Sequence, residues 1–377
     1  TSIPRTPYTD LWTRPTDWLA MPTILDTEEK VACLVPLYDH DSNFVAVIVS
    51  GAYTVDWADG TIENFASGVK AEHTYNYSTA SNLCANGFKQ VIMAIVPQNG
   101  QHLTSVTLNS SHTNSIDGHN NIMEFNGAGQ YITSLACSKL SSLRQASFGL
   151  NAITSFVNMF QNCASLQKIV TFNTSNGTDF SYMFSGCSSL QTIPLLVTSS
   201  GTNFSRMFYG CSSIQTIPLL DTSSGTDFNN MFYNCYSLQT IPALNTSKGT
   251  NFNYMFNGCN SLQTILLPDT SNGTSFNGMF YDCYFLQTIS ALNTSKGTNF
   301  DNMFSGCYSL SKATLLGIKY SIYYSGCRLS RLQLVDIFNN LGTVSGQTIT
   351  IAYCYGASSL TSTDRLIATN KGWTITG

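Results

Sequence analysis

A repeat of 24 residues dominates this chain. Between Ser155 and Leu316 one pattern is written seven times, and a cysteine marks each copy: Cys163, Cys187, Cys211, Cys235, Cys259, Cys283 and Cys307. A fixed period in this range is typical of a solenoid, whose units cannot bury an apolar face alone and do so against their neighbours. The sequence therefore predicts a stack of similar coils.

Within one repeat, apolar residues recur at the spacing of a short helix. Phe180, Met183, Phe184 and Cys187 stand at i, i+3, i+4 and i+7. A glycine such as Gly177 lies shortly before them and is expected to permit a tight turn. The residue before the first Phe is always Ser, Asp or Asn, the types that cap a helix N-terminus: Ser155, Asp179, Asn203, Asp227, Asn251, Ser275 and Asn299.

A brief parallel strand is expected after this helical turn. Leu190 and Ile193 should point inward, with residues 192–196 extended and a return loop behind them. Pro194 limits the strand, because proline cannot donate to a ladder. Equivalent positions on stacked coils lie roughly 5 Å apart, further than the roughly 3.8 Å between Cβ atoms that a disulfide requires. The cysteines are thus predicted to be buried free thiols.

The core of the repeat resembles a known family. Residues 207–218, MFYGCSSIQTIP, resemble the BspA-type leucine-rich repeats of bacterial surface proteins and phage structural proteins. The resemblance covers residues 155–316 and implies a leucine-rich-repeat solenoid. For function, it implies adhesion and surface display.

The N-terminal part has a different character. Residues 1–25 form an extended anchoring segment with three candidate docking anchors, Trp12, Arg14 and Trp18. Two readings are open: these side chains pack on the next domain, or they insert into a partner subunit. The segment also looks like the openings of phage structural proteins.

Residues 26–95 have the pattern of β-strands. The run 44–49 is β-branched, and the Asp59-Gly60 turn after an alternating strand predicts a hairpin. Trp57-x-Asp59-Gly60 and the His-Thr-Tyr that begins at His73 resemble the PKD-type immunoglobulin-like β-sandwich. Asp56, Asp59 and His73 form a conceivable metal or acid–base trio. The favoured interpretation is that Asp59 caps its own turn and His73 hydrogen-bonds a nearby loop.

Two further segments flank the repeats. Residues 96–154 are expected to be irregular N-terminal cap coils, with strands near 103–108 and 132–135. Residues 317–377 are expected to be a C-terminal αβ cap, with one helix over 332–341 and another beginning at 364. The predicted fold class is thus mainly β with short helices: an N-terminal sandwich, a solenoid of 24-residue coils and a cap.

Composition excludes several classes of function. Charged residues make up 10% of the chain and the net charge is −4, which argues against a nucleic-acid or anionic-membrane partner. No run of 18 apolar residues occurs, so no membrane insertion is expected, and the first 25 residues show no secretion signal. No catalytic motif stands out, and no catalytic residue, metal or cofactor is predicted.

Positions −5, −2 and +1 relative to each repeat cysteine vary, whereas the apolar positions do not. In the six repeats from Cys187 to Cys307 they hold Tyr, Asn, Ser, one Arg and one Gly, a composition suited to contact with a glycan or a protein. The plainer alternative is that solvent tolerates any residue there. The candidate binding surface is Tyr182, Arg206, Tyr209, Tyr233, Tyr236, Tyr254, Tyr281, Tyr284 and Tyr308.

These features favour a non-enzymatic virion structural protein, such as a phage tail or head fibre, spike or decoration. It would assemble in the reducing host cytoplasm, which suits twelve unpaired cysteines. The expected partners are other virion proteins through the N-terminal segment and a host-surface glycan or protein. Homo-oligomerisation fits such a part, although no heptad pattern demands it. The alternatives are a bacterial cell-surface adhesin and, less favoured, a polysaccharide-acting enzyme with paired acids on distant loops.

Overall fold

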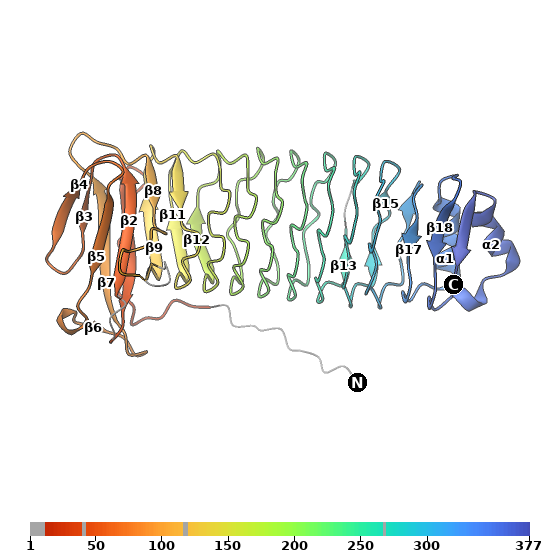
Figure 1. Ribbon diagram of the computed structural model, residues 1–377, viewed down its shortest axis with the longest axis horizontal. Helices are drawn as coiled ribbons and strands as arrows, with labels where there is room; N and C mark the ends of the chain where they lie inside the picture. The colour runs from red at the N-terminus through yellow and green to blue at the C-terminus, as the bar shows by residue number, and fades with distance from the viewer. Residues whose placement is uncertain (1–11, 40–42, 116–119, 267–268) are drawn as a thin grey trace. The chain divides into compact units, whose positions relative to one another are not determined.

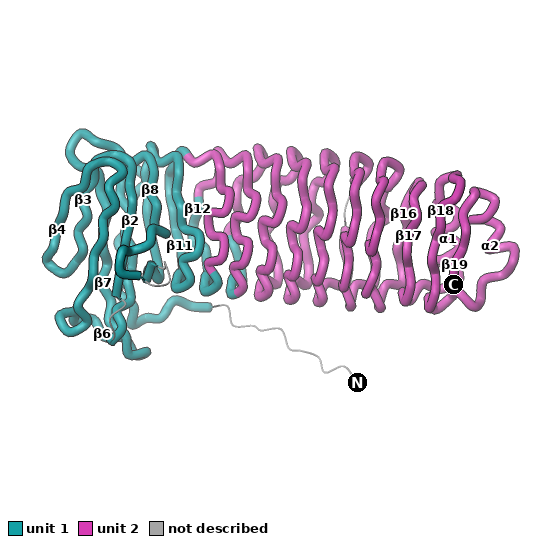
Figure 2. The backbone as a smooth tube through the Cα atoms, in the orientation of Figure 1, with its two compact units in different colours: residues 1–152, 164–172, 189–193 teal, residues 153–163, 173–188, 194–377 magenta. Residues whose placement is uncertain are grey.

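The computed structural model describes residues 12–39, 43–115, 120–266 and 269–377. The chain is mainly β with few helices (Figure 1). It divides into two compact units, shown in different colours in Figure 2: unit 1 comprises residues 1–152, 164–172 and 189–193, and unit 2 comprises 153–163, 173–188 and 194–377.

Unit 1 is built on two sheets. The eight-stranded sheet has the order β12-β11-β9-β1-β7-β3-β4, with β6 also paired to β7. Its strands are β1 (Lys30–Leu37), β3 (Tyr53–Asp56), β4 (Ile62–Phe65), β6 (Asn82–Leu83), β7 (Lys89–Pro97), β9 (Glu124–Ala128), β11 (Gln145–Phe148) and β12 (Lys168–Phe172). The four-stranded sheet has the order β10-β8-β2-β5, from β2 (Phe44–Ser50), β5 (Lys70–Thr74), β8 (Ser105–Thr107) and β10 (Ser134–Ala136).

Both sheets change from antiparallel to parallel pairing. β1 pairs antiparallel with β9, and β9 then pairs parallel with β11, which pairs parallel with β12. In the other sheet β2 pairs antiparallel with β8, and β8 pairs parallel with β10. The antiparallel strands therefore supply edges on which the first coils continue the same two sheets.

The predicted hairpin at Asp59-Gly60 is confirmed. β3 and β4 pair antiparallel with Asp56 opposite Ile62, so the turn lies where the Asp-Gly signal predicts. The single helical turn η1 (Tyr77–Thr79) follows β5.

In unit 2 the predicted helical turn of each repeat is wrong. Residues 180–187 form successive β-turns, with left-handed φ angles of 57° at Tyr182 and 77° at Gly186. The Met183 N–H donates to the Phe180 carbonyl at 3.2 Å, but the Phe184 N–H donates to Met207 in the next coil at 2.9 Å. The i, i+3, i+4, i+7 spacing fits both geometries, and the bonds between coils favour the turns.

The residue predicted as a helix cap closes the first of these turns. The Oδ1 atom of Asp179 accepts from the Ser181 N–H at 2.9 Å, and Asp227 accepts from Asn229 in the same way. Asp and Asn favour this local bond to the backbone two residues on. The side chains therefore cap as expected, but they cap a turn.

Apolar side chains form columns that run from coil to coil. The first and second Phe of each repeat stack on their equivalents, with centroids 5.4 to 5.8 Å apart and planes within 14° of parallel. The repeat cysteines are buried free thiols. Each Sγ from Cys187 to Cys307 donates to the carbonyl of a Phe 27 residues earlier, at 3.0 or 3.1 Å.

In the segment that follows the turns, threonine hydroxyl bonds join neighbouring coils more than strand pairing does. Buried Thr198 donates to the Asp221 carbonyl of the next coil at 2.8 Å, and Thr222 to Asn245 at 2.8 Å. The strand expected over 192–196 is reduced to one bridge between Thr192 and Lys168. In the first repeat the equivalent segment is the strand β12, and short strands form again only in later coils: β13 (Thr264–Ile265), β14 (Thr288–Ile289), β15 (Leu292–Asn293) and β16 (Leu315–Leu316).

The C-terminal part of unit 2 combines a parallel sheet with helices. The sheet has the order β17-β18-β19, and helix α2 is closed by a capping box between Thr361 and Asp364. The elements are β17 (Ile322–Tyr323), α1 (Arg331–Asn340), β18 (Gln347–Thr350), η2 (Ala357–Ser359), α2 (Ser362–Thr369) and β19 (Trp373–Thr376). The predicted helices at 332–341 and 364 are both present.

Candidate functional site

Five of the nine predicted surface residues line one groove in unit 2. The groove has a volume of about 610 Å³ and crosses five successive coils. Its walls come from positions −5 and −2, which the turns hold outward. The lining residues are Gln161, Tyr182, Ser185, Arg206, Tyr209, Asn230, Tyr233 and Tyr254. We call this hollow the Arg206 groove.

The tyrosine rings of the Arg206 groove are in contact with one another. Tyr209 stacks on Tyr233 with centroids 4.7 Å apart and planes 7° from parallel. Tyr254 meets Tyr233 edge-on, at 6.5 Å and 65°. Partial burial raises the pKa of Tyr233, and the neighbouring hydroxyls of Tyr209, Tyr236, Tyr254 and Tyr281 add to the effect.

Arg206 is the one cationic residue in the lining, and no Asp or Glu is among its members. Its guanidinium lies over the ring of Tyr182, 5.1 Å from the centroid, and Nη1 donates to the Tyr182 hydroxyl. None of the ion pairs formed by the described residues involves Arg206. Its charge is therefore held in place without a carboxylate partner.

Of the four remaining predicted tyrosines, Tyr281 is at position −2 and the other three are at position +1, in what we call the +1 column. Tyr236, Tyr284 and Tyr308 are exposed, and Tyr284 stacks on Tyr308 at 5.8 Å. The column continues into two residues that the sequence analysis missed, Arg328 and Tyr355. Both line a second hollow of about 520 Å³ with Gln287, Ser309, Ser311 and Ser330. They follow Cys327 and Cys354, so counting one residue on from those cysteines would have found them.

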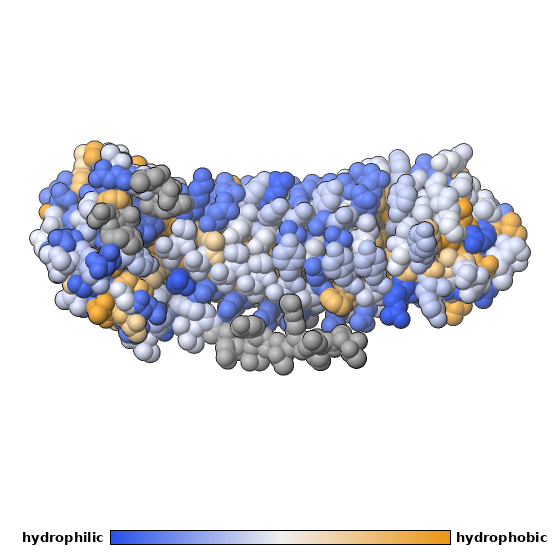
Figure 3. Space-filling view, turned by 60° about the horizontal axis from the view of Figure 1, so that its bottom comes forward, coloured by the Kyte–Doolittle hydropathy of each residue, from blue (hydrophilic) through white to orange (hydrophobic). Residues whose placement is uncertain are grey.

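In the face seen in Figure 3, the surface over the repeats is mostly hydrophilic or neutral, with few strongly hydrophobic residues.

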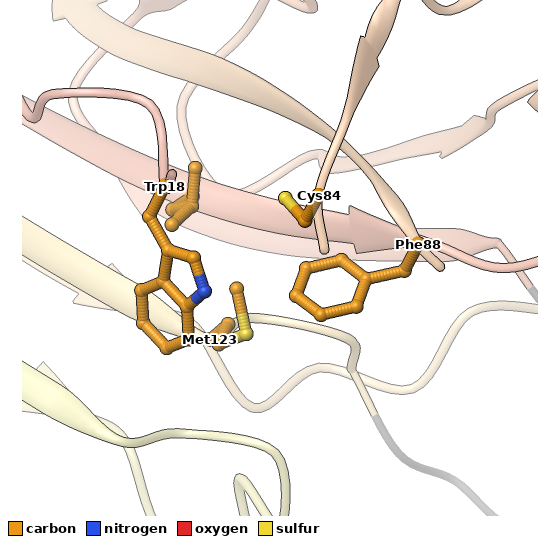
Figure 4. Close-up of a cluster of buried hydrophobic side chains, with 5 residues drawn as sticks. Trp18, Cys84, Phe88 and Met123 are labelled. Atoms are coloured by element: carbon orange, nitrogen blue, oxygen red, sulfur yellow. The ribbon is translucent and has the colours of Figure 1, made fainter. Parts of the chain in front are cut away.

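The three candidate docking anchors pack within unit 1. Trp18 is buried in a cluster with Leu34, Cys84, Phe88 and Met123 (Figure 4), and partly buried Trp12 donates its backbone N–H to Gln191 Oε1 at 2.7 Å. Arg14 Nε lies 2.7 Å from Glu124 Oε2. Of the two readings, packing on the chain's own domain is the one observed for these side chains. Residues 1–11 of the predicted anchoring segment lie outside the described residues.

Asp56, Asp59 and His73 have structural roles. Asp59 Oδ1 accepts from the Thr61 N–H at 3.0 Å, and Asp59 Oδ2 lies 2.7 Å from His73 Nε2. His73 also stacks on Trp57, 4.7 Å between centroids. Asp56 accepts from the Ala58 N–H at 2.9 Å. The predicted turn cap and loop bond are confirmed. Among the residues described, no group of three or more His, Cys, Asp or Glu side chains is placed to hold a metal ion.

In the part of the chain that the structure describes, no helix has both the length and the apolar character needed to span a bilayer.

The fold and its contacts define a β-solenoid of 24-residue coils. Residues 134–240 and 202–315 match a family described as "Mycoplasma protein of unknown function, DUF285". No curated protein matches the chain. The solved "Crystal structure of TLR13-ssRNA13 complex" is similar at 15% identity and a TM-score of 0.24, over 61% of this chain and 45% of that chain. The family matches and the 24-residue coils fit a BspA-type repeat protein.

Proposed function

We propose that this chain is a non-enzymatic structural protein of a phage virion, in a tail or head fibre, spike or decoration. The nine residues of the candidate binding surface, which we call the tyrosine face, would attach to a host-surface glycan or to a partner protein. The observation that carries the proposal is the Arg206 groove. Its lining residues change from coil to coil, whereas the buried Phe, Met and Cys repeat without change. Variation at outward positions beside an unchanging core suits recognition more than packing.

The other parts are assigned supporting roles in this proposal. Residues 26–95 would be a PKD/Ig-like mount, 96–154 the N-terminal cap coils and 317–377 the C-terminal cap. Residues 1–25, although Trp12, Arg14 and Trp18 pack within unit 1, would dock other virion proteins through the rest of the segment, and homo-oligomerisation fits such an assembly. Twelve buried cysteines that form no disulfide suit folding in a host cytoplasm, and a surface with few charges suits display outside the cell.

A bacterial cell-surface adhesin is the second candidate. The family match, described from Mycoplasma, and the BspA-type repeats favour it. A polysaccharide-acting enzyme is the least favoured, because glycoside hydrolysis uses paired carboxylates and the Arg206 groove is lined by none.

Two experiments test the proposal. Labelling of phage particles with an antibody to this chain separates a virion part from an adhesin, which would label the bacterial surface. Attachment of the full chain to host cells should fall strongly when Tyr209, Tyr233 and Tyr281 are replaced by alanine. The control is alanine at Tyr320 and Tyr323, which are exposed but outside the groove. Unchanged attachment of the triple variant would remove the tyrosine face from the proposal.

A further inference from the structure

The Arg206 groove has an unmatched positive charge in a lining that is otherwise neutral. Its other members offer tyrosine and serine hydroxyls and the amides of Gln161 and Asn230. Such groups pair with hydroxyls, while a guanidinium pairs in a fork with a carboxylate. No aliphatic side chain lines the groove, so the apolar anchors of a protein partner have no counterpart here.

Tyr254 is fixed as a platform at one end of the groove. Its ring lies over Gly278, where a Cβ would be 2.3 Å from Cε1, and its hydroxyl accepts from Asn277 Nδ2 at 3.1 Å. In coils that hold Asn230 or Asn302 at the position of Gly278, a side chain fills this space. The next coil thus occupies one side of the ring, and Tyr254 lines the groove from this fixed position.

We propose that the Arg206 groove binds an acidic saccharide of the uronic-acid class. Arg206 pairs with the sugar carboxylate, the hydroxyls and amides bond the sugar hydroxyls, and Tyr254 stacks on a sugar ring. Tyr182 is a positioning residue that holds the guanidinium through its hydroxyl. This inference rests on the proposed function and names the chemistry of its ligand.

Titration of the full chain with polygalacturonate, at fixed salt, tests the inference. Arg206→Gln should weaken binding about tenfold or more, because a charge-assisted hydrogen bond contributes about 1.5–3 kcal/mol. The affinity of Arg206→Lys should lie between those of the parent and of Arg206→Gln, because an ammonium keeps the charge but cannot donate the two parallel hydrogen bonds of a guanidinium. The matched control is Arg328→Gln, which removes an exposed arginine from the second hollow and should change affinity less than twofold.

Two further comparisons test the roles of Tyr254 and of the sugar carboxylate. Gly278→Asn installs a residue that other coils carry at this position, so the fold is kept, and displacement of Tyr254 should weaken binding severalfold. Methyl-esterified polygalacturonate should bind about tenfold more weakly than the free acid. Equal losses from Arg206→Gln and Arg328→Gln would overturn the inference in favour of general charge attraction. Tighter binding of polyglutamate than of polygalacturonate would overturn it in favour of an acidic peptide.

The two proposals fail in different ways. If polygalacturonate does not bind while the tyrosine triple variant loses cell attachment, the sugar class is wrong and the attachment role stands. If the triple variant attaches normally, the attachment role is wrong whatever the polysaccharide does.

Discussion

Gly225 lies so close to the ring of Phe228 that a Cβ on the glycine would be 2.6 Å from Cζ. The φ angle at Gly225 is not positive, so the glycine is required for space and not, as expected from the sequence, for a special turn. Phe228 cannot move aside easily, because it stacks on Phe204 and on Phe252, at 5.8 and 5.7 Å.

Gly225→Ala should therefore lower the free energy of unfolding by about 1–3 kcal/mol, the usual cost of overpacking. Chemical denaturation followed by circular dichroism measures this change. Ser224→Ala in the same loop is the control, expected to stay within about 0.5 kcal/mol. An alanine variant as stable as the parent would mean that Phe228 and the rings stacked on it can shift to make room for the added Cβ.

The thiols should be inert in the folded chain. Burial raises the pKa of Cys187, Cys235 and Cys259 well above the usual value, and only a thiolate that reagent can reach reacts. Ellman's reagent at pH 8 should give no fast reaction with native protein, and twelve thiols in guanidinium chloride. Rapid reaction of several thiols before unfolding would contradict the packed column.

Removal of Arg14 should destabilise unit 1. Glu124 is almost fully buried, and burial raises its pKa even though Arg14 and Gln145 bond it. Arg14→Gln leaves that carboxylate without its ion-pair partner, so we expect a loss of about 3 kcal/mol. Unfolding monitored by tryptophan fluorescence measures it. The double variant Arg14→Met with Glu124→Met should recover much of the loss, and failure to recover would rule out the unpaired charge as the cause.

The pair between Arg331 and Asp364 should make stability sensitive to acid. The two hydrogen bonds from Arg331, at 2.8 and 2.9 Å, hold the pKa of Asp364 at about 2, below its usual 3.8. A carboxyl whose pKa is depressed in the folded state stabilises the fold at pH values above its unfolded-state pKa. That stability is lost as the pH falls through its folded-state pKa. The difference in denaturation midpoint between the parent and Arg331→Gln should be constant above about pH 4 and shrink toward pH 2. A difference that persists at pH 2 would exclude the ionised pair.

The period and the inward positions could be predicted from the sequence because burial in a stack forces the same residue to recur. Backbone conformation could not. Tyr182 and Arg206 have left-handed φ angles of 57° and 55°, and neither residue type signals that geometry; only the Gly or Asn at equivalent positions hints at it. The helix prediction failed because two successive turns place apolar residues at the same spacing as a helix.

The site was predictable to the extent that the period held. Tyr182, Arg206 and Tyr209 are found by counting from their cysteines. Arg328 and Tyr355 were missed because Cys327 follows Cys307 by 20 residues and the count breaks. The role of Trp18 was left open because a tryptophan beside prolines suits an internal anchor and an external one equally.

The coil-to-coil bonds have a consequence for how such a chain changes length. The Phe stacks and the buried Thr hydroxyl bonds of the middle repeats join residues 24 and 23 positions apart. Deletion or duplication of 24 residues, starting anywhere in this region, would restore the same types of buried neighbour. Unequal crossing-over between tandem copies would thus yield longer or shorter variants whose coils still stack. Their binding repertoire would shift by whole rows of outward side chains.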